Sequence, residues 1–500
     1  MKFPLFADLD RDQRAVFSES PKNGGVLIVG PPGSGKTVLA MHRACRLAKS
    51  GKVTIGMYTK TLRQYTSNFD DLPENATVIH LHDWVETWYT NAFNTKTHPF
   101  IFPKKYNIDW EQIDKDITNA SEAQKRKLHW GHLIIDEGQD FSRKMYSVLT
   151  KFMFSQDDPT LTLSVFADDN QTIFNDNSTI SELKTELNAS PRNKRFWRVD
   201  KNYRNTKDVA RFARHFQVMD SGTLTLPDRE GMKPIIFVNK DFDSQIQHIA
   251  KYCEVQTDKE IGVIVPGTSS FVRKTYNAIK STLGSNNSNY LVQTYIGDKK
   301  YGLNQYQNLQ FDKPPSITII HQASSKGLEF DVVFVMNLEG LYMKPGAEID
   351  GFKKLYVVSS RPRDHLYYMV EGSPEKGGFK DVMRLFPNPH DKDLLCTYRT
   401  TDKDLQPHLE GMLNDVDWLE NAQKHKRSMY GDIAKKLSKL SITEIKKIIT
   451  DSVQGQWDYS HIPQLFNDRV ENNKDIEESI LDTLVDLSNA SNKYITEKLG

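Results

Sequence analysis

The stretch that most constrains the fold is "GPPGSGKT", residues 30–37, which fits the pattern G-x-x-x-x-G-K-[ST]. The apolar run "GGVLIV" precedes it, and a helical segment follows it. In that context the backbone N–H groups of the loop can cradle phosphates, Lys36 can reach the β- and γ-phosphates, and Thr37 can ligate Mg²⁺. We therefore predict that ATP and Mg²⁺ are cofactors and that the nucleotide contacts Gly30, Pro31, Pro32, Gly33, Ser34, Gly35, Lys36 and Thr37.

Short apolar runs alternate with helical segments over most of the chain. The later runs are "VTIGMYT", "HLIID", "LTLSVFAD", "ITII" and "DVVFVMNL". Strands that alternate with helices indicate parallel sheets with helices on both faces. The 500 residues, 38% of them hydrophobic, suffice for two to four domains.

Interruptions of this alternation predict the domain organisation. We expect a first α/β domain from residues 1–89 and 129–216, with an inserted subdomain at 90–128. A second α/β domain would span 217–390, and a helical extension would span 391–500. Within the extension, "SITEIKKIIT" gives Ser441 and Glu444 the spacing of a capping box.

Composition excludes several classes of protein. The chain starts without a signal-like segment, and no stretch approaches 18 apolar residues, so we expect a soluble cytoplasmic protein with no membrane partner. The net charge of +1 does not by itself indicate a polyanion partner. Residues 192–214, however, carry nine Lys/Arg with interleaved aromatic residues, which fits either a phosphate-binding segment or a solvated helix face.

A carboxylate run, "DEGQD", follows the apolar run "HLII". Asp136 is the expected Mg²⁺ carboxylate, and Glu137 is placed to orient or deprotonate an attacking water. A kinase or a simple switch needs the aspartate but not the neighbouring glutamate. The pair therefore indicates hydrolysis.

With Gln139, the D-E-x-Q run resembles superfamily 1 helicases of the UvrD/Rep type. Other stretches similar to motifs of that family appear in order over roughly residues 9–370: "LDRDQRAVF", "GMYTKTL", "HLHDW", "VFADDNQTIF", "VDKNYRNT", "SSKGLEFDVVFV" and "LYVVSSRPRDHLYYMV". The resemblance implies two RecA-like domains with ATP hydrolysed in the cleft between them.

The same resemblance implies roles for residues around the nucleotide. Gln13 would read the adenine edge, and Tyr203 would stack on the ring. Glu329 would hold the ribose. Arg204 would meet the γ-phosphate, and Arg361 would act as an arginine finger from the second domain, a contribution that can be worth about 10³ to 10⁵ in turnover.

The resemblance also implies a path for a nucleic-acid strand. Thr59 and His82 would contact DNA, while Asp168 and Gln171 would link the γ-phosphate to the strand. The family usually continues its sensor motif with a tryptophan and an arginine that stack on bases, whereas this chain offers only Phe174. A stacked base contributes about 1 to 3 kcal/mol, so we expect the grip to depend on phosphate contacts from segments such as 192–214.

Two further departures concern the second domain. Pro362 replaces a usual small residue after Arg361, which is tolerable if it opens a helix. Only about 120 residues separate "NYRN" from "SSKGLEF", too few for the large mobile subdomain that relatives insert there. We expect a compact motor.

The sequence favours an ATP-dependent DNA helicase or single-strand translocase that acts on single-stranded or partially duplex DNA, with 3′ to 5′ polarity implied by the resemblance alone. One alternative is an RNA-directed motor, since phosphate tracking does not distinguish the sugars. The other is a non-unwinding, nucleic-acid-stimulated ATPase. It would act with a protein partner, such as a nuclease in repair or phage defence, through the C-terminal extension.

Overall fold

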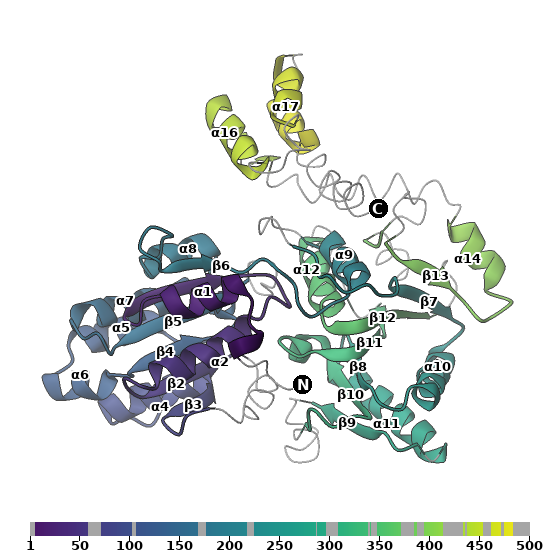
Figure 1. Ribbon diagram of the computed structural model, residues 1–500, viewed down its shortest axis with the longest axis horizontal. Coiled ribbons are helices and arrows are strands. Elements are labelled where there is room, and N and C mark those ends of the chain that lie inside the picture. Colours follow the sequence, from purple (N-terminus) through teal and green to yellow (C-terminus); the bar gives the residue numbers. More distant parts are fainter. Residues whose placement is uncertain are drawn as a thin grey trace.

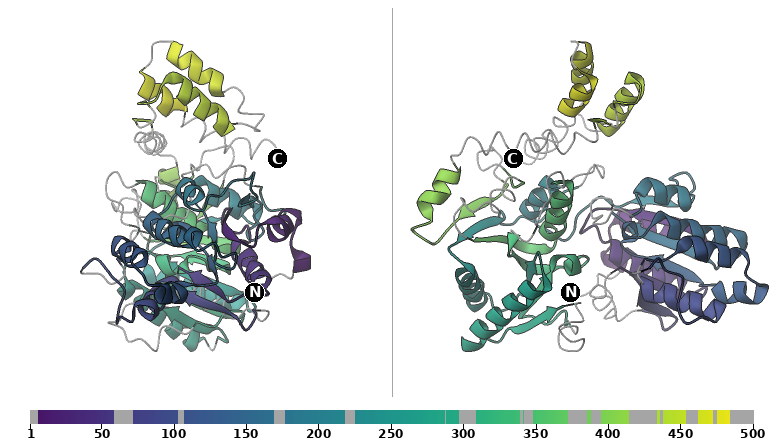
Figure 2. Two further views of the ribbon diagram at one scale, coloured as in Figure 1. Left: turned by 90° about the vertical axis from the view of Figure 1, so that its left-hand side faces the viewer. Right: turned by 180° about the vertical axis from the view of Figure 1, so that it is seen from behind.

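The chain forms two α/β halves that lie side by side. A computed structural model describes residues 6–58, 72–102, 107–168, 177–217, 225–286, 288–296, 309–338, 341, 348–371, 385–387, 395–413, 434–435, 438–453, 462–471 and 475–483. The first half lies on the left of Figure 1 and the second on the right, while α16 (Ile442–Val453) and α17 (Ile462–Glu471) stand apart above them. The views in Figure 2 agree with this arrangement.

The first half is built on a six-stranded sheet with the order β3-β2-β4-β5-β1-β6, in which every paired strand runs parallel to its neighbour. Its strands are β1 (Gly24–Val29), β2 (Val53–Met57), β3 (Ala76–His80), β4 (His132–Ile135), β5 (Thr162–Ala167) and β6 (Phe196–Arg198). The glycine-rich loop of residues 30–37, called the P-loop below, directly follows β1. Asp136 directly follows β4, and Asp168 directly follows β5. Because the strands are parallel, these groups meet at the carboxyl edge of the sheet.

Helices cover both faces of this sheet. They are α1 (Arg11–Glu19), α2 (Lys36–Leu47), α4 (Leu81–Phe93), α5 (Trp110–Thr118), α6 (Glu122–Leu128), α7 (Arg143–Ser155) and α8 (Ile180–Glu186). Residues 90–128, expected to form an inserted subdomain, contain α5 and α6. Trp110, Ile113 and Leu128 of these helices are buried in the same apolar cluster as β1, β4 and β5. In the described part of the insertion, the core is therefore shared with the first sheet.

The second half contains a seven-stranded sheet with the order β13-β7-β12-β11-β8-β10-β9. Its strands are β7 (Ile235–Asn239), β8 (Glu260–Val265), β9 (Leu291–Tyr295), β10 (Ser316–His321), β11 (Phe330–Val335), β12 (Pro362–Glu371) and β13 (Thr397–Arg399). The helices packed on it are α9 (Lys207–His215), α10 (Phe242–Val255), α11 (Ser269–Ser285) and α12 (Glu348–Ser359). The fold is thus two parallel sheets flanked by helices, as predicted, and it is consistent with two RecA-like domains.

Two segments belong to the second half although the predicted boundaries exclude them. Helix α9 precedes residue 217, yet the ring of Phe212 lies 5.8 Å from that of Tyr368 in β12 and 6.1 Å from that of Phe386. Strand β13 follows residue 390, yet it pairs with β7. Both boundaries were drawn from interruptions of the strand–helix alternation, which do not show which sheet receives the apolar face of a helix or a short edge strand.

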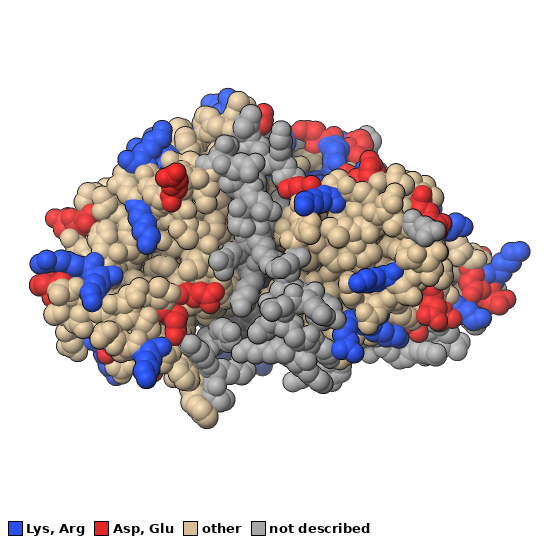
Figure 3. Space-filling model, turned by 90° about the horizontal axis from the view of Figure 1, so that it is seen from below, with Lys and Arg blue, Asp and Glu red and all other residues tan. Residues whose placement is uncertain are grey.

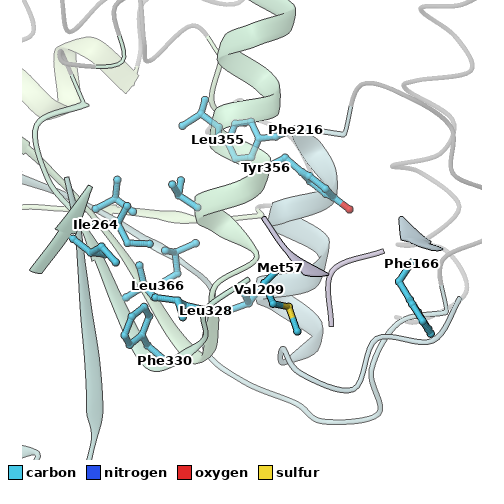
Figure 4. Packing of buried hydrophobic residues seen from close by; sticks show 14 of the residues in the cluster. Met57, Phe166, Val209, Phe216, Ile264, Leu328, Phe330, Leu355, Tyr356 and Leu366 are labelled. Atoms are coloured by element: carbon cyan, nitrogen blue, oxygen red, sulfur yellow. The ribbon is translucent and has the colours of Figure 1, made fainter. Parts of the chain in front are cut away.

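One buried apolar cluster contains residues of both halves. It includes Met57 and Phe166 from the first sheet and Ile264 from the second (Figure 4). Leu355 and Tyr356 of α12 belong to the same cluster. The two halves are therefore in direct apolar contact and not merely tethered by a linker.

Near the C-terminus, α16, α17 and the helical residues 476–483 form a separate small cluster in which Ile445, Phe466 and Ile480 are buried together. Helix α14 (Gln406–Leu413) lies apart from this cluster, on the side of β13 (Figure 1). The capping box is confirmed, because the Glu444 carboxylate accepts hydrogen bonds from the backbone N and Oγ of Ser441 at 2.9 and 2.6 Å. In the described part of the chain, no helix is long and apolar enough to cross a bilayer.

The packing of α9 on the second sheet can be tested with a matched pair of phenylalanines. Phe212→Ala should lower the free energy of unfolding by about 3 to 5 kcal/mol, because it leaves a cavity in a fully buried site. Phe154→Ala, on a ring that is 54% exposed, should change it by less than about 0.5 kcal/mol. Urea unfolding gives both values. Unchanged hydrogen-exchange protection of β12 in Phe212→Ala would contradict the assignment of α9 to the second half.

Candidate nucleotide site between the two halves

The P-loop adopts a backbone conformation that favours glycine and packs closely against the segment after β6. Gly33 and Gly35 have φ values of +78° and +84°. A Cβ at Gly33 would lie 2.4 Å from Oδ1 of Asn202 and 2.9 Å from Cβ of Arg204. The backbone N of Tyr203 donates to the Gly33 carbonyl at 2.8 Å. The phosphate-binding loop is therefore held by the segment that leads into the second half.

The predicted phosphate and Mg²⁺ ligands meet at this loop. The Lys36 ammonium is buried and donates to the carbonyls of Gly30 and Pro31 at 2.7 and 2.9 Å. The Thr37 hydroxyl donates to Oδ2 of Asp136 at 2.7 Å. Within the described ranges, no three His, Cys, Asp or Glu side chains are grouped to hold a metal by themselves. A hydroxyl beside one carboxylate fits Mg²⁺, which binds with nucleotide phosphates and water.

The two adjacent carboxylates differ in electrostatic environment. Burial, and next the charge of Glu137, raise the pKa of Asp136 to about 6. Burial alone would also raise the pKa of Glu137, but the positive charges of Lys326 and Lys36 outweigh it and leave that pKa below its ordinary value. Glu137 therefore carries the charge that a base for water requires.

A chain of hydrogen bonds orients Glu137. Its backbone lies in the left-handed region with φ of +54°, a conformation uncommon for a residue with a side chain. Nε2 of Gln139 donates to Oε2 of Glu137 at 2.6 Å, and Oε1 of Gln139 accepts from the backbone N of Asp168 at 2.9 Å. The Gly138 carbonyl accepts from the Tyr146 hydroxyl at 2.6 Å. The glutamine thus connects the carboxylate to the end of β5.

Lys326, from the second half, inserts between the carboxylates of Glu137 and Asp140. Its side chain is fully buried, and its Nζ lies 2.6 Å from Oδ2 of Asp140 and 3.9 Å from Oε2 of Glu137. Despite Lys326, burial raises the pKa of Asp140 to about 7. Sequence reasoning missed this lysine. It stands in the quoted run "SSKGLEF", but nothing in the sequence shows that its partners lie on the other half.

The predicted ribose ligand, Glu329, is engaged by two arginines. Its carboxylate lies 2.5 Å from Nε of Arg204 and 3.0 Å from an Nη of Arg363. Burial would raise the pKa of Glu329, but these two positive charges hold it below its ordinary value. Arg204 also donates to the Ser360 carbonyl at 3.3 Å. Arg204 therefore lies at the seam, the boundary between the two halves, and Glu329 orients it. Its contact with a γ-phosphate stays a prediction.

Arg361 is buried in the second half behind the seam. It donates to the carbonyls of Val357 and Leu328 at 2.8 and 3.3 Å. Burial, and next the charge of Arg204, lower its pKa to about 9, while the charge of Glu137 acts in the opposite direction. The expectation that Pro362 opens a helix is wrong, because Pro362 is the first residue of β12. Proline is tolerated there since the first residue of a strand need not donate to the ladder.

Gln13 and Tyr203 lie beside the P-loop, where the resemblance implies an adenine site. Nε2 of Gln13 donates to the Ser34 carbonyl at 3.1 Å. Gln13 also forms a capping box with Asp10 at the start of α1, and the Tyr203 hydroxyl donates to the same aspartate. The Tyr203 ring is 41% exposed. Nζ of Lys201 lies over this ring, 5.4 Å from its centroid.

Of the predicted strand contacts, His82 is within the described residues, whereas Thr59, Gln171 and Phe174 lie outside them. Burial, and next the charge of His80, lower the pKa of His82 to about 4, so its ring is neutral. It lines a cavity of about 580 Å³ whose wall also includes Tyr58, Asp140 and Phe141. The cavity thus shares Asp140 with the carboxylate run of residues 136–140.

In the basic segment 192–214, five of the nine Lys/Arg side chains lie beside carboxylates: Lys194, Arg198, Lys201, Arg204 and Lys207. On the face seen in Figure 3, basic and acidic side chains are interspersed over both halves. The paired cations of this segment would each have to exchange a carboxylate for a phosphate before they could hold a strand.

Comparison with known proteins supports a nucleotide-binding domain. A protein-family profile described as an AAA domain matches residues 12–176, whereas a search of curated proteins finds no match. One similar solved structure is the C-terminal domain of a possible DNA helicase from Lactobacillus plantarum WCFS1, with 19% sequence identity, a TM-score of 0.27, and coverage of 40% of this chain and 99% of that one. Another is Arterivirus nonstructural protein 10, a helicase, with 13% identity, a TM-score of 0.30, and coverage of 75% of this chain and 64% of that one. The fold assignment depends on the chain's own sheets. Residues 12–176 are therefore similar to an AAA domain.

The close approach of the P-loop to the segment after β6 can be tested at Gly33. Gly33→Ala should weaken nucleotide binding by about tenfold or more, because a positive φ and two contacts under 3 Å force the loop to shift. Gly284→Ala is the control, since nothing lies within 4 Å of its Cβ. Titration with a fluorescent ATP analogue measures both. Equal affinity in the two variants would show that the loop tolerates the displacement.

Proposed function

We propose that the chain is an ATP- and Mg²⁺-dependent DNA helicase or single-strand translocase of the UvrD/Rep type, acting on single-stranded or partially duplex DNA with 3′ to 5′ polarity. One observation carries the proposal. Glu137, the proposed base of the first half, faces cations of the second half, with Nζ of Lys326 at 3.9 Å from its Oε2. The cytoplasmic location expected from the sequence stays a prediction.

In the proposed site, each half supplies a different part. Lys36 and the loop N–H groups would bind the phosphates, and Thr37 with Asp136 would hold Mg²⁺, which neutralises phosphate charge when bound. Glu137 would accept the proton of the attacking water, since it is charged and held by Gln139. The first half thus contains the groups needed to bind ATP and activate water.

The second half would make hydrolysis depend on closure of the seam. Arg204 and Arg361 would oppose the charge that develops on the γ-phosphate, and Glu329 would set the direction of Arg204. Gln13 and Tyr203 would select the base. Because Tyr203 and Arg204 lie on the segment that joins the halves, and this segment contacts the loop of residues 30–37, ATP binding and hydrolysis would change how the halves meet. That motion is what a stepping motor requires.

The strand path is proposed from the resemblance and from the cavity beside the carboxylate run. His82 and the aromatic rings of Tyr58 and Phe141 line this cavity, and unstacked bases bind well to aromatic groups. Thr59, Gln171 and Phe174 remain proposed contributors. Because five of the nine cations of 192–214 lie beside carboxylates, the proposed grip depends less on that segment than the sequence alone suggests.

Two variants separate binding from hydrolysis. Lys36→Ala should abolish hydrolysis and weaken nucleotide binding, because it removes the cation that faces the phosphates. Glu137→Gln should instead retain bound ATP and lower kcat by about 10² to 10⁴, because the water loses its base while Thr37 and Asp136 remain. Nucleotide titration and steady-state ATPase assays distinguish the two. Near-normal turnover in both variants would contradict an ATP-hydrolysing motor.

The substrate prediction is tested with strands of equal length. Single-stranded DNA should stimulate the ATPase more than RNA does, and partial duplexes with a 3′ overhang should be displaced while those with a 5′ overhang are not. Binding should weaken with salt at a log–log slope of about −0.7 per phosphate contacted. Equal stimulation by RNA would favour the RNA-directed motor. Stimulation without displacement of either duplex would favour the non-unwinding ATPase that serves a partner.

A further inference from the structure

Lys326 is a fully buried cation of the second half that lies beside two carboxylates of the first half, Asp140 and Glu137. It follows the turn η5 (Gln322–Ser325) of the second half, whereas Asp140 ends the turn η2 (Gly138–Asp140) of the first. Neither the Lys326 nor the Asp140 side chain is exposed to solvent. An ammonium group in such a place is stable only if it is paired, so the contact exists only while the halves are together.

The two carboxylates lie at different distances from Nζ of Lys326, and this separates their roles. At 2.6 Å, the Lys326–Asp140 contact is a charge-assisted hydrogen bond. At 3.9 Å, the distance to Oε2 of Glu137 is too long for a hydrogen bond but short enough for strong attraction inside a protein. Asp140 therefore anchors the ammonium, and Glu137 is the group that the anchored charge acts upon. The same Oε2 accepts a hydrogen bond from Gln139. The hydrogen bond and the nearby ammonium therefore act on one oxygen and define the direction of the Glu137 carboxylate.

We propose that Lys326 is a positioning residue that the second half supplies to Glu137: anchored on Asp140, its charge holds the Glu137 carboxylate in place for the attacking water. This inference rests on the proposed function as an ATPase. It deepens that function, because it makes the base of the first half competent only when the seam is closed. Opening of the seam would remove the cation and leave adjacent carboxylates to repel each other.

A purely structural role for the same ion pair is the main alternative, and a double replacement separates the two. Removing one partner of a buried pair is strongly destabilising, whereas replacing both is often close to neutral. Lys326→Met should therefore lower both Tm and kcat. Lys326→Met combined with Asp140→Asn should regain most of the lost Tm, while kcat stays at least about tenfold below wild type, because Glu137 still lacks its cation.

A second comparison asks whether Lys326 acts through Glu137. Residues that act as a unit are not additive, so Lys326→Met should cause no further loss of single-turnover rate in a Glu137→Gln background. The affinity for a fluorescent ATP analogue should change by less than about threefold in Lys326→Met, since the group acts on the chemical step. Lys259→Met is the matched control, because Lys259 lies 3.5 Å from Asp364 within the second half and should leave kcat unchanged.

Each of these measurements either supports or overturns the proposed role of Lys326. The proposal is overturned if Lys326→Met turns over at the wild-type rate, if the double replacement restores kcat together with Tm, or if the loss of rate is the same with and without Glu137. It is also overturned if Lys259→Met causes an equal loss. Failure of the proposed function looks different, since Glu137→Gln would then itself keep near-normal turnover. An inactive Glu137→Gln variant together with a fully active Lys326→Met variant would contradict the role of Lys326 but leave the proposed function standing.

Discussion

Buried negative charge at the carboxyl edge of the first sheet is the constraint on which the rest of the structure depends. Asp136, Glu137 and Asp140 are all nearly inaccessible to solvent. A carboxylate in such surroundings is costly unless it is paired. The first half supplies the hydroxyl of Thr37 and the charge of Lys36, and the second half supplies the fully buried Lys326 that pairs with Asp140. The two halves are therefore electrostatically incomplete without each other, in addition to sharing an apolar cluster.

The segment between β6 and α9 connects the P-loop of the first half with the second half. Its backbone touches the P-loop at Gly33, and its side chain Arg204 reaches Glu329 in the second half. A displacement of the loop would therefore move a group that helps to hold the seam. Close packing transmits such shifts because interiors contain few voids that could absorb them. This contact explains how a small change around a phosphate could alter the relation between two sheets.

Several functional side chains could be predicted because their positions follow from local rules. A P-loop after one strand and carboxylates after another must meet at the same edge of a parallel sheet, so the contact between Thr37 and Asp136 follows from the motifs. The roles given to Gln13, Tyr203 and Glu329 depended on a family resemblance, and the structure brings Gln13 and Tyr203 beside the P-loop. Composition was a weaker guide. It suggested a basic strand-binding segment in which five of the nine cations lie beside carboxylates.

The sequence by itself determined the local structure: alternating strands and helices, the phosphate loop, the carboxylate run and the capping box at Ser441. These depend on interactions between neighbours in the chain. Only the tertiary structure decided that α9 belongs to the second half and that Lys326 meets Asp140, 186 residues away. The reason is physical, since an apolar helix face or a buried charge can be satisfied by any suitable partner, and the choice among partners is made by the packing of the whole chain.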